Sequence, residues 1–233
     1  MNSYKYTDKT SYSLGTSLTI EALKHSPQYV YEVILSDKIQ KNEQYQKLIS
    51  LLDINNIPYS FNDKLIEKIS VKENCYCIGF FNKFYRNIQS DEHIVLYQFS
   101  EYGELGTIIR SAVSFDYKDI ILIDSDIDYF DPRCIRASMG AIFHCNIEKY
   151  NSLDEYLNKY KYNIYPFSSK QDKELNNLKL NKPYSIIIGQ DYHSLDDKFN
   201  ESYYIKHNND EEISLSIRSS IILEKAFYLK RNL

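Results

Sequence analysis

Residues 119–137 read Asp-Ile-Ile-Leu-Ile-Asp-Ser-Asp-Ile-Asp-Tyr-Phe-Asp-Pro-Arg-Cys-Ile-Arg-Ala, and this stretch decides the fold class. The run Asp119–Ile123 is apolar after its first residue, which is typical of a strand buried on both faces of a parallel sheet. Asp131 and Pro132 then combine an N-cap residue with a proline at the first helical position. A buried strand followed by a helix start predicts an α/β unit.

Strands and helices alternate on both sides of this stretch, which argues for a mainly parallel sheet. Apolar or β-rich runs predict strands at residues 29–35, 75–81, 93–99, 119–123, 141–147, 163–167, 185–189 and 203–206, and a short one that opens at Pro58. Apolar residues at helical spacing predict helices at residues 17–25, 42–54, 62–69 with Asn62 as N-cap, 104–115, 153–160 and 213–229. About the first ten residues are predicted to form a polar arm.

The predicted elements divide into two series. The first series makes a small α/β unit, and the polar residues 82–92 are its predicted linker to the second. We therefore predict an N-terminal domain over residues 1–88 and a larger domain over residues 89–233. A chain of 233 residues is long enough for two such domains with real cores.

Composition excludes several classes of protein. Apolar residues make up 43% and charged residues 26%, which is a globular composition. The net charge of −4 argues against a protein that binds polyanions over its whole surface. No run of about 18 apolar residues is present, so no membrane span is expected. Met1–Tyr6 lacks the apolar stretch of a signal peptide, so we expect a cytoplasmic protein.

The cysteines argue against a disulfide framework. No Cys-x-x-Cys is present, and the four cysteines are expected to be buried thiols. Cys75-x-Cys77 would place two thiols on one face of a strand, but a zinc site needs more converging ligands. His144 is predicted to be a satisfied core or interface residue. We therefore predict no metal site.

Several residue patterns leave two interpretations open. Four of the six glycines lie at strand or helix ends, where they serve either a ligand or a plain turn: Gly103, Gly106, Gly140 and Gly189. Three of the six arginines fall between residues 110 and 136, and they form either a phosphate site or ion pairs with nearby aspartates. The acidic run 124–128 could mimic a magnesium site, although no phosphate-cradling loop accompanies it.

Residues 103–147 resemble a known family. Gly103–Ala112, Gly-Glu-Leu-Gly-Thr-Ile-Ile-Arg-Ser-Ala, resembles the first motif of the SpoU-type, or TrmH-like, RNA ribose methyltransferases of the SPOUT superfamily. Phe130–Phe143 resembles their second motif nearly unaltered. Ile187–Gly189, followed by Ser214-Leu215 before the last predicted helix, resembles the third. The N-terminal unit resembles the small substrate-binding domain, like ribosomal protein L30e, that many members carry.

The resemblance implies an α/β fold whose C-terminal domain is a trefoil-knotted parallel sheet, an exception to the rule against knots. It implies a homodimer that binds S-adenosylmethionine and methylates a ribose 2′-hydroxyl of ribosomal or transfer RNA. It also implies roles for individual residues. Arg110 and Arg136 would contact RNA, Arg110 would help to deprotonate the hydroxyl, and the donor would contact the backbone at Gly189, Ile205 and Leu215. Ser214 would be the serine of the third motif.

The chain departs from the family pattern at several candidate site residues. Glu104 stands at the asparagine of the first motif, and Ser216 at the asparagine of the third. The loop of the third motif has become Gly189-Gln190-Asp191-Tyr192-His193-Ser194. Lys206 replaces a proline, and Arg218 stands where a small residue is usual. Glu104 would repel RNA phosphate unless it pairs with Arg110.

Three functions follow from these patterns. The first is an active RNA ribose 2′-O-methyltransferase, with Arg110, Ser214, Glu104 and Ser216 as candidate catalytic residues. The second is a catalytically inactive homodimer that kept the fold and serves as an RNA-binding or assembly module. The third keeps donor binding but changes the acceptor, with Glu104 as a base. Only the second predicts that the donor does not bind.

Overall fold

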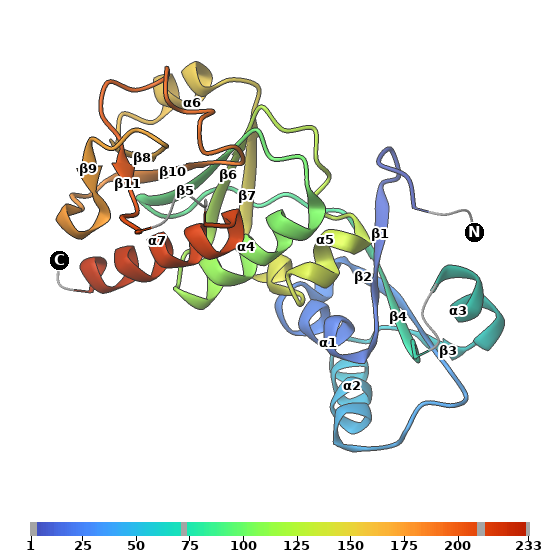
Figure 1. Cartoon of the computed structure of the whole chain (residues 1–233). Coiled ribbons are helices and arrows are strands. Elements are labelled where there is room, and N and C mark those ends of the chain that lie inside the picture. The colour runs from blue at the N-terminus through green and yellow to red at the C-terminus, as the bar shows by residue number, and fades with distance from the viewer. Residues whose placement is uncertain (1–3, 71–73, 209–212, 232–233) are drawn as a thin grey trace. The chain divides into compact units, whose positions relative to one another are not determined.

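The computed structural model describes residues 4–70, 74–208 and 213–231, and it divides the chain into two compact units. Unit 1 comprises residues up to Phe84 together with Asp128–His144, and unit 2 comprises Tyr85–Ile127 and residues from Cys145 onward. Each unit has its own sheet (Figure 1). In the part of the chain that the structure describes, no helix has both the length and the apolarity to cross a bilayer.

Unit 1 is a four-stranded mixed sheet with the strand order β1-β4-β2-β3. β4 runs antiparallel to both β1 and β2, whereas β3 runs parallel to β2. The strands are β1 (Thr10–Leu14), β2 (Val30–Leu35), β3 (Tyr59–Phe61) and β4 (Cys77–Asn82). The helices are α1 (Thr16–His25), η1 (Pro27–Tyr29), α2 (Glu43–Ile54), α3 (Asp63–Ile69), α5 (Pro132–Ala137) and η2 (Ala141–His144). Asn62 caps α3 by accepting the Leu65 N–H, as predicted.

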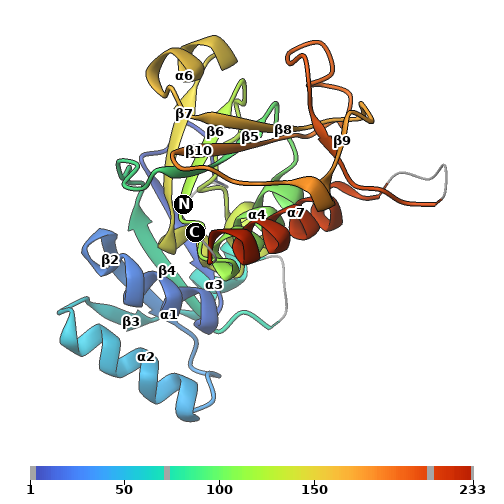
Figure 2. The same ribbon diagram turned by 90° about the vertical axis from the view of Figure 1, so that its left-hand side faces the viewer.

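Unit 2 contains a seven-stranded sheet, in which every strand pair is parallel, with the order β7-β6-β5-β10-β8-β11-β9. Its strands are β5 (Glu92–Tyr97), β6 (Asp119–Ile123), β7 (Asn146–Tyr150), β8 (Asn163–Phe167), β9 (Lys173–Glu174), β10 (Tyr184–Gly189) and β11 (Tyr203–Tyr204). Its helices are α4 (Tyr102–Ser114), α6 (Leu153–Lys159), η3 (Leu175–Asn177) and α7 (Leu215–Lys230). α4 and α7 lie side by side on one side of this sheet, and α6 lies on the other (Figure 2).

The core of unit 2 explains why its central strands are so apolar. Alternate residues of β5, β6 and β10 form one buried cluster with Leu153 and Tyr156 of α6. The intervening residues of the same strands, such as Ile94, Ile120 and Ile186, are also fully buried. Strands buried on both faces need apolar side chains at every position, and this confirms the predicted parallel α/β sheet.

The segment 128–144 lies with unit 1, although the predicted domain boundary places it in the C-terminal domain. The ring of Phe81 on β4 lies 5.6 Å from that of Phe130 and 5.2 Å from that of Phe143, measured between centroids. Ser11 Oγ also donates to the carbonyl of Phe130 at 2.6 Å. Aromatic packing thus attaches this segment to unit 1. The domain assignment 1–88 and 89–233 stays a prediction.

One sequence-based prediction of local structure is wrong, and one strand of unit 1 was not predicted. Residues 141–147 do not form one strand, because Gly140 at φ 82° turns the chain and residues 141–144 form η2 before β7 begins at Asn146. The strand β1 begins at Thr10, where the predicted polar arm ends, and it was not predicted. Its buried side chains are Ser11 and Ser13, whose hydroxyls are hydrogen-bonded, so no apolar alternation marks it.

The cysteines are buried thiols, as predicted. Cys75 and Cys77 lie in unit 1 beside and on β4, and burial raises the pKa of the Cys77 thiol to about 12. A thiol with such a pKa stays protonated at neutral pH and is a poor nucleophile or metal ligand.

A buried histidine gives unit 2 a testable pH dependence. His93 on β5 is fully buried, with Nε2 3.1 Å from the Ser90 carbonyl and Nδ1 2.8 Å from the Tyr156 hydroxyl. The carbonyl can only accept, so Nε2 carries the proton and Nδ1 accepts from Tyr156. Burial lowers the pKa of His93 below its ordinary value of 6.5, against the raising effect of the Ser90 carbonyl.

We expect the free energy of unfolding to fall in mild acid because of His93. Its folded pKa is below its unfolded pKa, so its stability contribution is complete above pH 6.5 and is lost as the pH falls from there toward the folded value. Urea unfolding between about pH 7.5 and about pH 5.5 should therefore show a steeper loss in the wild type than in His93→Gln, which cannot titrate. Equal pH dependence in the two proteins would contradict a neutral buried His93.

Candidate functional site

The carboxyl edge of the parallel sheet of unit 2 is the candidate site, because open parallel sheets bind ligands outside the carboxyl ends of their strands. The neighbouring strands β5 and β10 end there at Tyr97 and Gly189. The loops after them are tied together. Gln190 N–H donates to the Tyr97 carbonyl at 3.0 Å, and Ser100 N–H donates to Gln190 Oε1 at 2.6 Å. The two loops therefore form one continuous rim.

Two residues of this rim have a left-handed backbone. Gln98 follows β5 with φ 59°, and Asp124 follows β6 with φ 51°. The Gln98 side-chain Nε2 donates to Asp124 Oδ2 at 2.7 Å. Non-glycine residues rarely adopt this conformation, and such residues gather at functional sites. Sequence reasoning missed Gln98 and Ser100, because neither backbone strain nor a contact between loops leaves a pattern in the chain.

Gly189 closes a tight turn at the end of β10. A Cβ on Gly189 would lie 2.1 Å from Ser194 Oγ and 2.7 Å from the Asp191 carbonyl oxygen, so only glycine fits. Ser194 Oγ donates to that same carbonyl at 2.7 Å. The replacement of a glycine by Ser194 in the loop is therefore accommodated, since its hydroxyl takes part in the turn. Gly189 therefore allows two backbone segments to approach each other closely, which is the turn role that the sequence left open for it.

Arg218 on α7 projects into this turn. Its side chain is buried, and Nη2 lies 3.2 Å from the Gly189 carbonyl and 3.5 Å from the Gln190 carbonyl, to which it donates. Its guanidinium carbon lies 4.1 Å from the centroid of the Tyr192 ring. Arginine suits such a place because its planar cation can stack on an aromatic ring and donate hydrogen bonds at the same time.

Arg218 also leaves little free space at the predicted donor site. It lines a cavity of about 10 Å³ together with Tyr192, Ile205, His207 and Ile213. Ile205 and Leu215 are buried at this site, whereas Ser214 is exposed as the N-cap residue of α7 and Ser216 is half-buried in its first turn. The structure thus brings Ile205 together with Arg218, and Arg218 with Gly189. The roles predicted for Gly189, Ile205 and Leu215 toward a methyl donor stay predictions.

Two further predicted site residues lie on α4, which begins at the same edge. Glu104 is half-buried in the first turn of α4, where the positive end of the helix dipole favours a carboxylate. Arg110 is exposed near the other end of α4. Within the described residues neither side chain forms an ion pair, so Glu104 is not neutralised by Arg110.

The remaining arginines and the acidic run belong partly to unit 1. Arg136 is exposed on α5, and Arg133 pairs with Asp131 through Nη2 and Oδ2 at 2.8 Å. Arg133 therefore forms an ion pair, which is the second of the two roles that the sequence left open for these arginines. Asp128 pairs with Lys83 at 2.7 Å, while Asp124 binds Gln98 in unit 2. Asp128 and Asp124 thus each have a polar partner within their own unit.

The structure is similar to several solved structures of RNA methyltransferases. An rRNA methyltransferase from Sinorhizobium meliloti shares 19% identity at a TM-score of 0.77, with 97% of this chain and 88% of that chain covered. The SpoU methyltransferase AviRb from Streptomyces viridochromogenes, in complex with the cofactor AdoMet, shares 14% identity at a TM-score of 0.79, with 97% and 92% covered. An RNA 2′-O ribose methyltransferase shares 15% identity at a TM-score of 0.78, with 96% and 90% covered.

At identities this low, these similarities establish the fold. No curated protein matches the sequence. A family model gives the more specific result, because the model of the SpoU rRNA Methylase family matches residues 91–207, half of the chain. This range contains the first and second motifs and the Gly189 turn. The chain therefore belongs to the SpoU rRNA methylase family.

Proposed function

We propose that the protein is an RNA methyltransferase that transfers a methyl group from S-adenosylmethionine to a ribose 2′-hydroxyl of ribosomal or transfer RNA. The observation that carries the proposal is the closed turn at Gly189, at the carboxyl edge of a parallel sheet and beside the loop that leads into α4. Membership of the SpoU family supports it, as do the solved structures in complex with AdoMet.

The backbone at the Gly189 turn suits contact with a methyl donor, but the side chain of Arg218 fills the space beside it. Gly189 provides a turn that a Cβ would block, and Ile205 and Leu215 supply apolar surface near it. The cavity of about 10 Å³ is far below the roughly 300 Å³ of a small-molecule site. Because Arg218 lines that cavity and bonds the Gly189 carbonyl, we propose that donor binding displaces the Arg218 side chain.

The chain's own residues supply orientation and charge. When bound, S-adenosylmethionine supplies an electrophilic methyl group. A ribose hydroxyl is a poor nucleophile, so the protein has to position it and assist the removal of its proton. Arg110 holds an RNA phosphate by charge-assisted hydrogen bonds and stabilises the developing alkoxide. Ser214 and Ser216, at the start of α7, orient polar groups of the RNA substrate. Arg136 contacts a second RNA phosphate.

The proposal includes an assembly and a topology. We propose a homodimer, because an exposed cation on α4 can serve a site completed by a second copy. The C-terminal domain is proposed to form the trefoil knot of this superfamily over residues 89–233. The N-terminal domain, residues 1–88, is proposed to bind RNA like its L30e-like counterparts. A cytoplasmic location fits a substrate of ribosomal or transfer RNA.

Alkaline hydrolysis of methyl-labelled RNA tests the proposal. Incubation with RNA and S-adenosylmethionine labelled in its methyl group should place the label on ribose. A 2′-O-methyl group removes the hydroxyl that attacks the next phosphodiester, so the label should be recovered in alkali-resistant dinucleotides. Recovery of the label in mononucleotides would show methylation of a base and would contradict the proposal.

Glu104 is expected to weaken RNA binding, because its unpaired carboxylate lies on the helix that carries Arg110. Glu104→Asn should therefore strengthen RNA binding at low salt, by about 2- to 5-fold for one like-charge contact of roughly 0.5–1 kcal/mol. Filter binding over a salt series measures this effect, and the gain should shrink as the salt concentration rises. Glu104→Asp is the matched control that keeps the charge. An unchanged affinity would place Glu104 away from the RNA.

A second candidate function is an RNA-binding or assembly module without methyl transfer. The observation that favours it is the buried guanidinium of Arg218, which donates to the carbonyl of Gly189, a residue proposed to contact the donor. The two candidates make opposite predictions for donor binding, and the Arg218 variant described in the Discussion separates them.

A further inference from the structure

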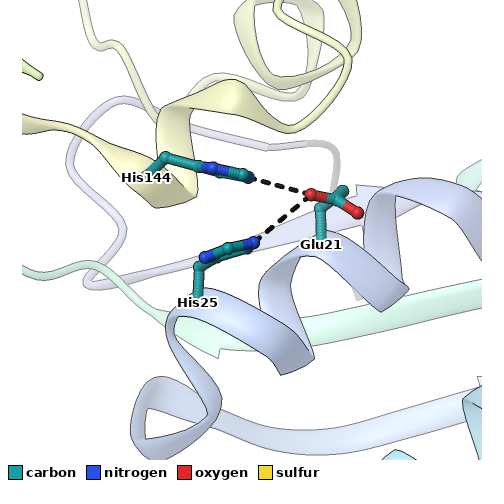
Figure 3. Close-up of side chains that lie close together, drawn as sticks. All are labelled: Glu21, His25 and His144. Atoms are coloured by element: carbon teal, nitrogen blue, oxygen red, sulfur yellow. Dashed lines mark hydrogen bonds and ion pairs between the residues drawn. The ribbon is translucent and has the colours of Figure 1, made fainter. Parts of the chain in front are cut away.

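We propose that Glu21, His25 and His144 form a binding site for one divalent first-row transition-metal ion in unit 1 (Figure 3). One carboxylate oxygen and two imidazole nitrogens lie within 4.8 Å of one another. From the sequence alone, no metal site is expected here and His144 is placed in a strand. None of these three residues belongs to the proposed donor site in unit 2, so this inference does not depend on the proposed function.

The fold brings the three side chains together from two elements. Glu21 and His25 stand four residues apart on α1, so they lie on one face of that helix. His144 is the last residue of η2, and Ser26 Oγ donates to the carbonyl of the preceding residue, Phe143, at 3.1 Å. That hydrogen bond ties the end of η2 to the end of α1.

A glycine makes room for the carboxylate. Gly140 has φ 82°, and a Cβ built on it would lie 2.8 Å from the Cβ of Glu21. The chain before η2 therefore approaches Glu21 more closely than any other residue type at position 140 would allow. This approach places the imidazole of His144 beside that of His25, with ring centroids 3.5 Å apart and the rings stacked.

The distances suit a metal ion with short bonds. Glu21 Oε2 lies 2.8 Å from His144 Nε2 and 3.6 Å from His25 Nε2. Zinc bonds to imidazole and carboxylate of about 2.0–2.1 Å in a tetrahedron put neighbouring ligand atoms about 3.3 Å apart. The two separations bracket that value. The two imidazole rings are stacked at an interplanar angle of 29°, so binding of one ion requires a ring rotation that points both nitrogen lone pairs at it.

The surroundings orient the ligands and leave the site open. Lys24 Nζ donates to Glu21 Oε1 at 3.0 Å, so the other oxygen, Oε2, faces the two imidazoles. The side chains of Glu21, His25 and His144 are 25%, 39% and 23% exposed, so a hydrated ion can reach them. Two imidazoles and one carboxylate form a ligand set for zinc and related divalent ions, with water in the remaining positions.

Calorimetry with Zn²⁺ on the full-length, metal-free protein tests the site. We expect one ion per chain. Loss of a direct ligand should cost more than the roughly 10- to 100-fold in affinity that loss of an outer-shell partner costs. His144→Ala and Glu21→Gln should therefore bind Zn²⁺ more than about 100-fold more weakly than the wild type. His193→Ala is the matched control, since its ring faces one carboxylate, Asp196, at 3.2 Å.

The absorption spectrum of the Co²⁺-loaded wild-type protein is the second readout, and it does not depend on any variant folding. Nitrogen and oxygen ligands should give d–d bands without a thiolate charge-transfer band. A thiolate band would assign the ion to cysteine and overturn the proposal. So would the absence of binding to the wild type, or Zn²⁺ binding of unchanged affinity in folded His144→Ala and Glu21→Gln.

Discussion

Arg110→Ala should lower the rate of methyl transfer by about 10²–10³-fold, which is the usual cost of removing one group that stabilises developing negative charge in the transition state. Arg110 is exposed on α4 and forms no ion pair with any described residue, so its charge is available for an RNA phosphate. Its removal should cost binding as well as rate. Single-turnover measurements at saturating RNA separate the two, because they report the chemical step alone.

Controls decide whether the loss at Arg110 is specific. Arg110→Lys keeps the charge but lacks the bidentate guanidinium, so it should retain part of the activity. Arg231→Ala removes an exposed arginine at the end of α7, outside the site, and should leave activity unchanged. Size-exclusion chromatography should show the same assembly for each variant. Full activity in Arg110→Ala would exclude the mechanism proposed for it.

Arg218→Ala should raise the affinity for S-adenosylmethionine by at least about tenfold. In the wild type the donor competes with the Arg218 side chain. The apparent affinity for the donor is therefore the intrinsic affinity multiplied by the fraction of molecules in which that side chain is displaced. A hydrogen bond from a charged group contributes about 1.5–3 kcal/mol, and the lower figure already corresponds to a factor of about ten. Arg218 donates to the carbonyls of Gly189 and Gln190.

The matched variant for Arg218 is Arg218→Met, which keeps most of the side-chain volume but loses the charge and the hydrogen bonds. It should bind the donor with an affinity between those of the wild type and Arg218→Ala if volume and bonds both oppose binding. Calorimetry measures all three proteins, and thermal unfolding checks that each is folded. An Arg218→Ala protein that is folded and binds no better than the wild type would show that Arg218 does not oppose the donor.

Much of the sheet was predictable because of how its strands are buried. Asp119–Ile123 was predicted with the bounds that the structure shows, since a run of apolar residues marks a strand with two covered faces. Asn163–Phe167 was also predicted with its observed bounds. β1 escaped prediction because its buried positions are serines with hydroxyl partners. η2 escaped because Ala141-Ile142-Phe143 is as apolar as a strand, and only the turn at Gly140 decides its shape.

For the candidate site, the sequence supplied candidate residues but not the contacts between them. The motifs indicated Gly189, Ile205 and Leu215, and the structure places Ile205 and Gly189 around Arg218. The sequence marked Arg218 as unusual but did not show where its guanidinium points, because that depends on the angle at which α7 meets the turn. The cluster at Glu21 was equally hidden, since it needs a chain reversal between α5 and β7.

Titration of S-adenosylmethionine into the full-length wild-type protein and into Arg218→Ala tests the central claim most directly. The account predicts one donor molecule per chain in both proteins, with the tighter binding in Arg218→Ala. Absence of binding to both folded proteins would contradict it, and would leave a member of the SpoU family that kept the fold and binds RNA without a methyl donor.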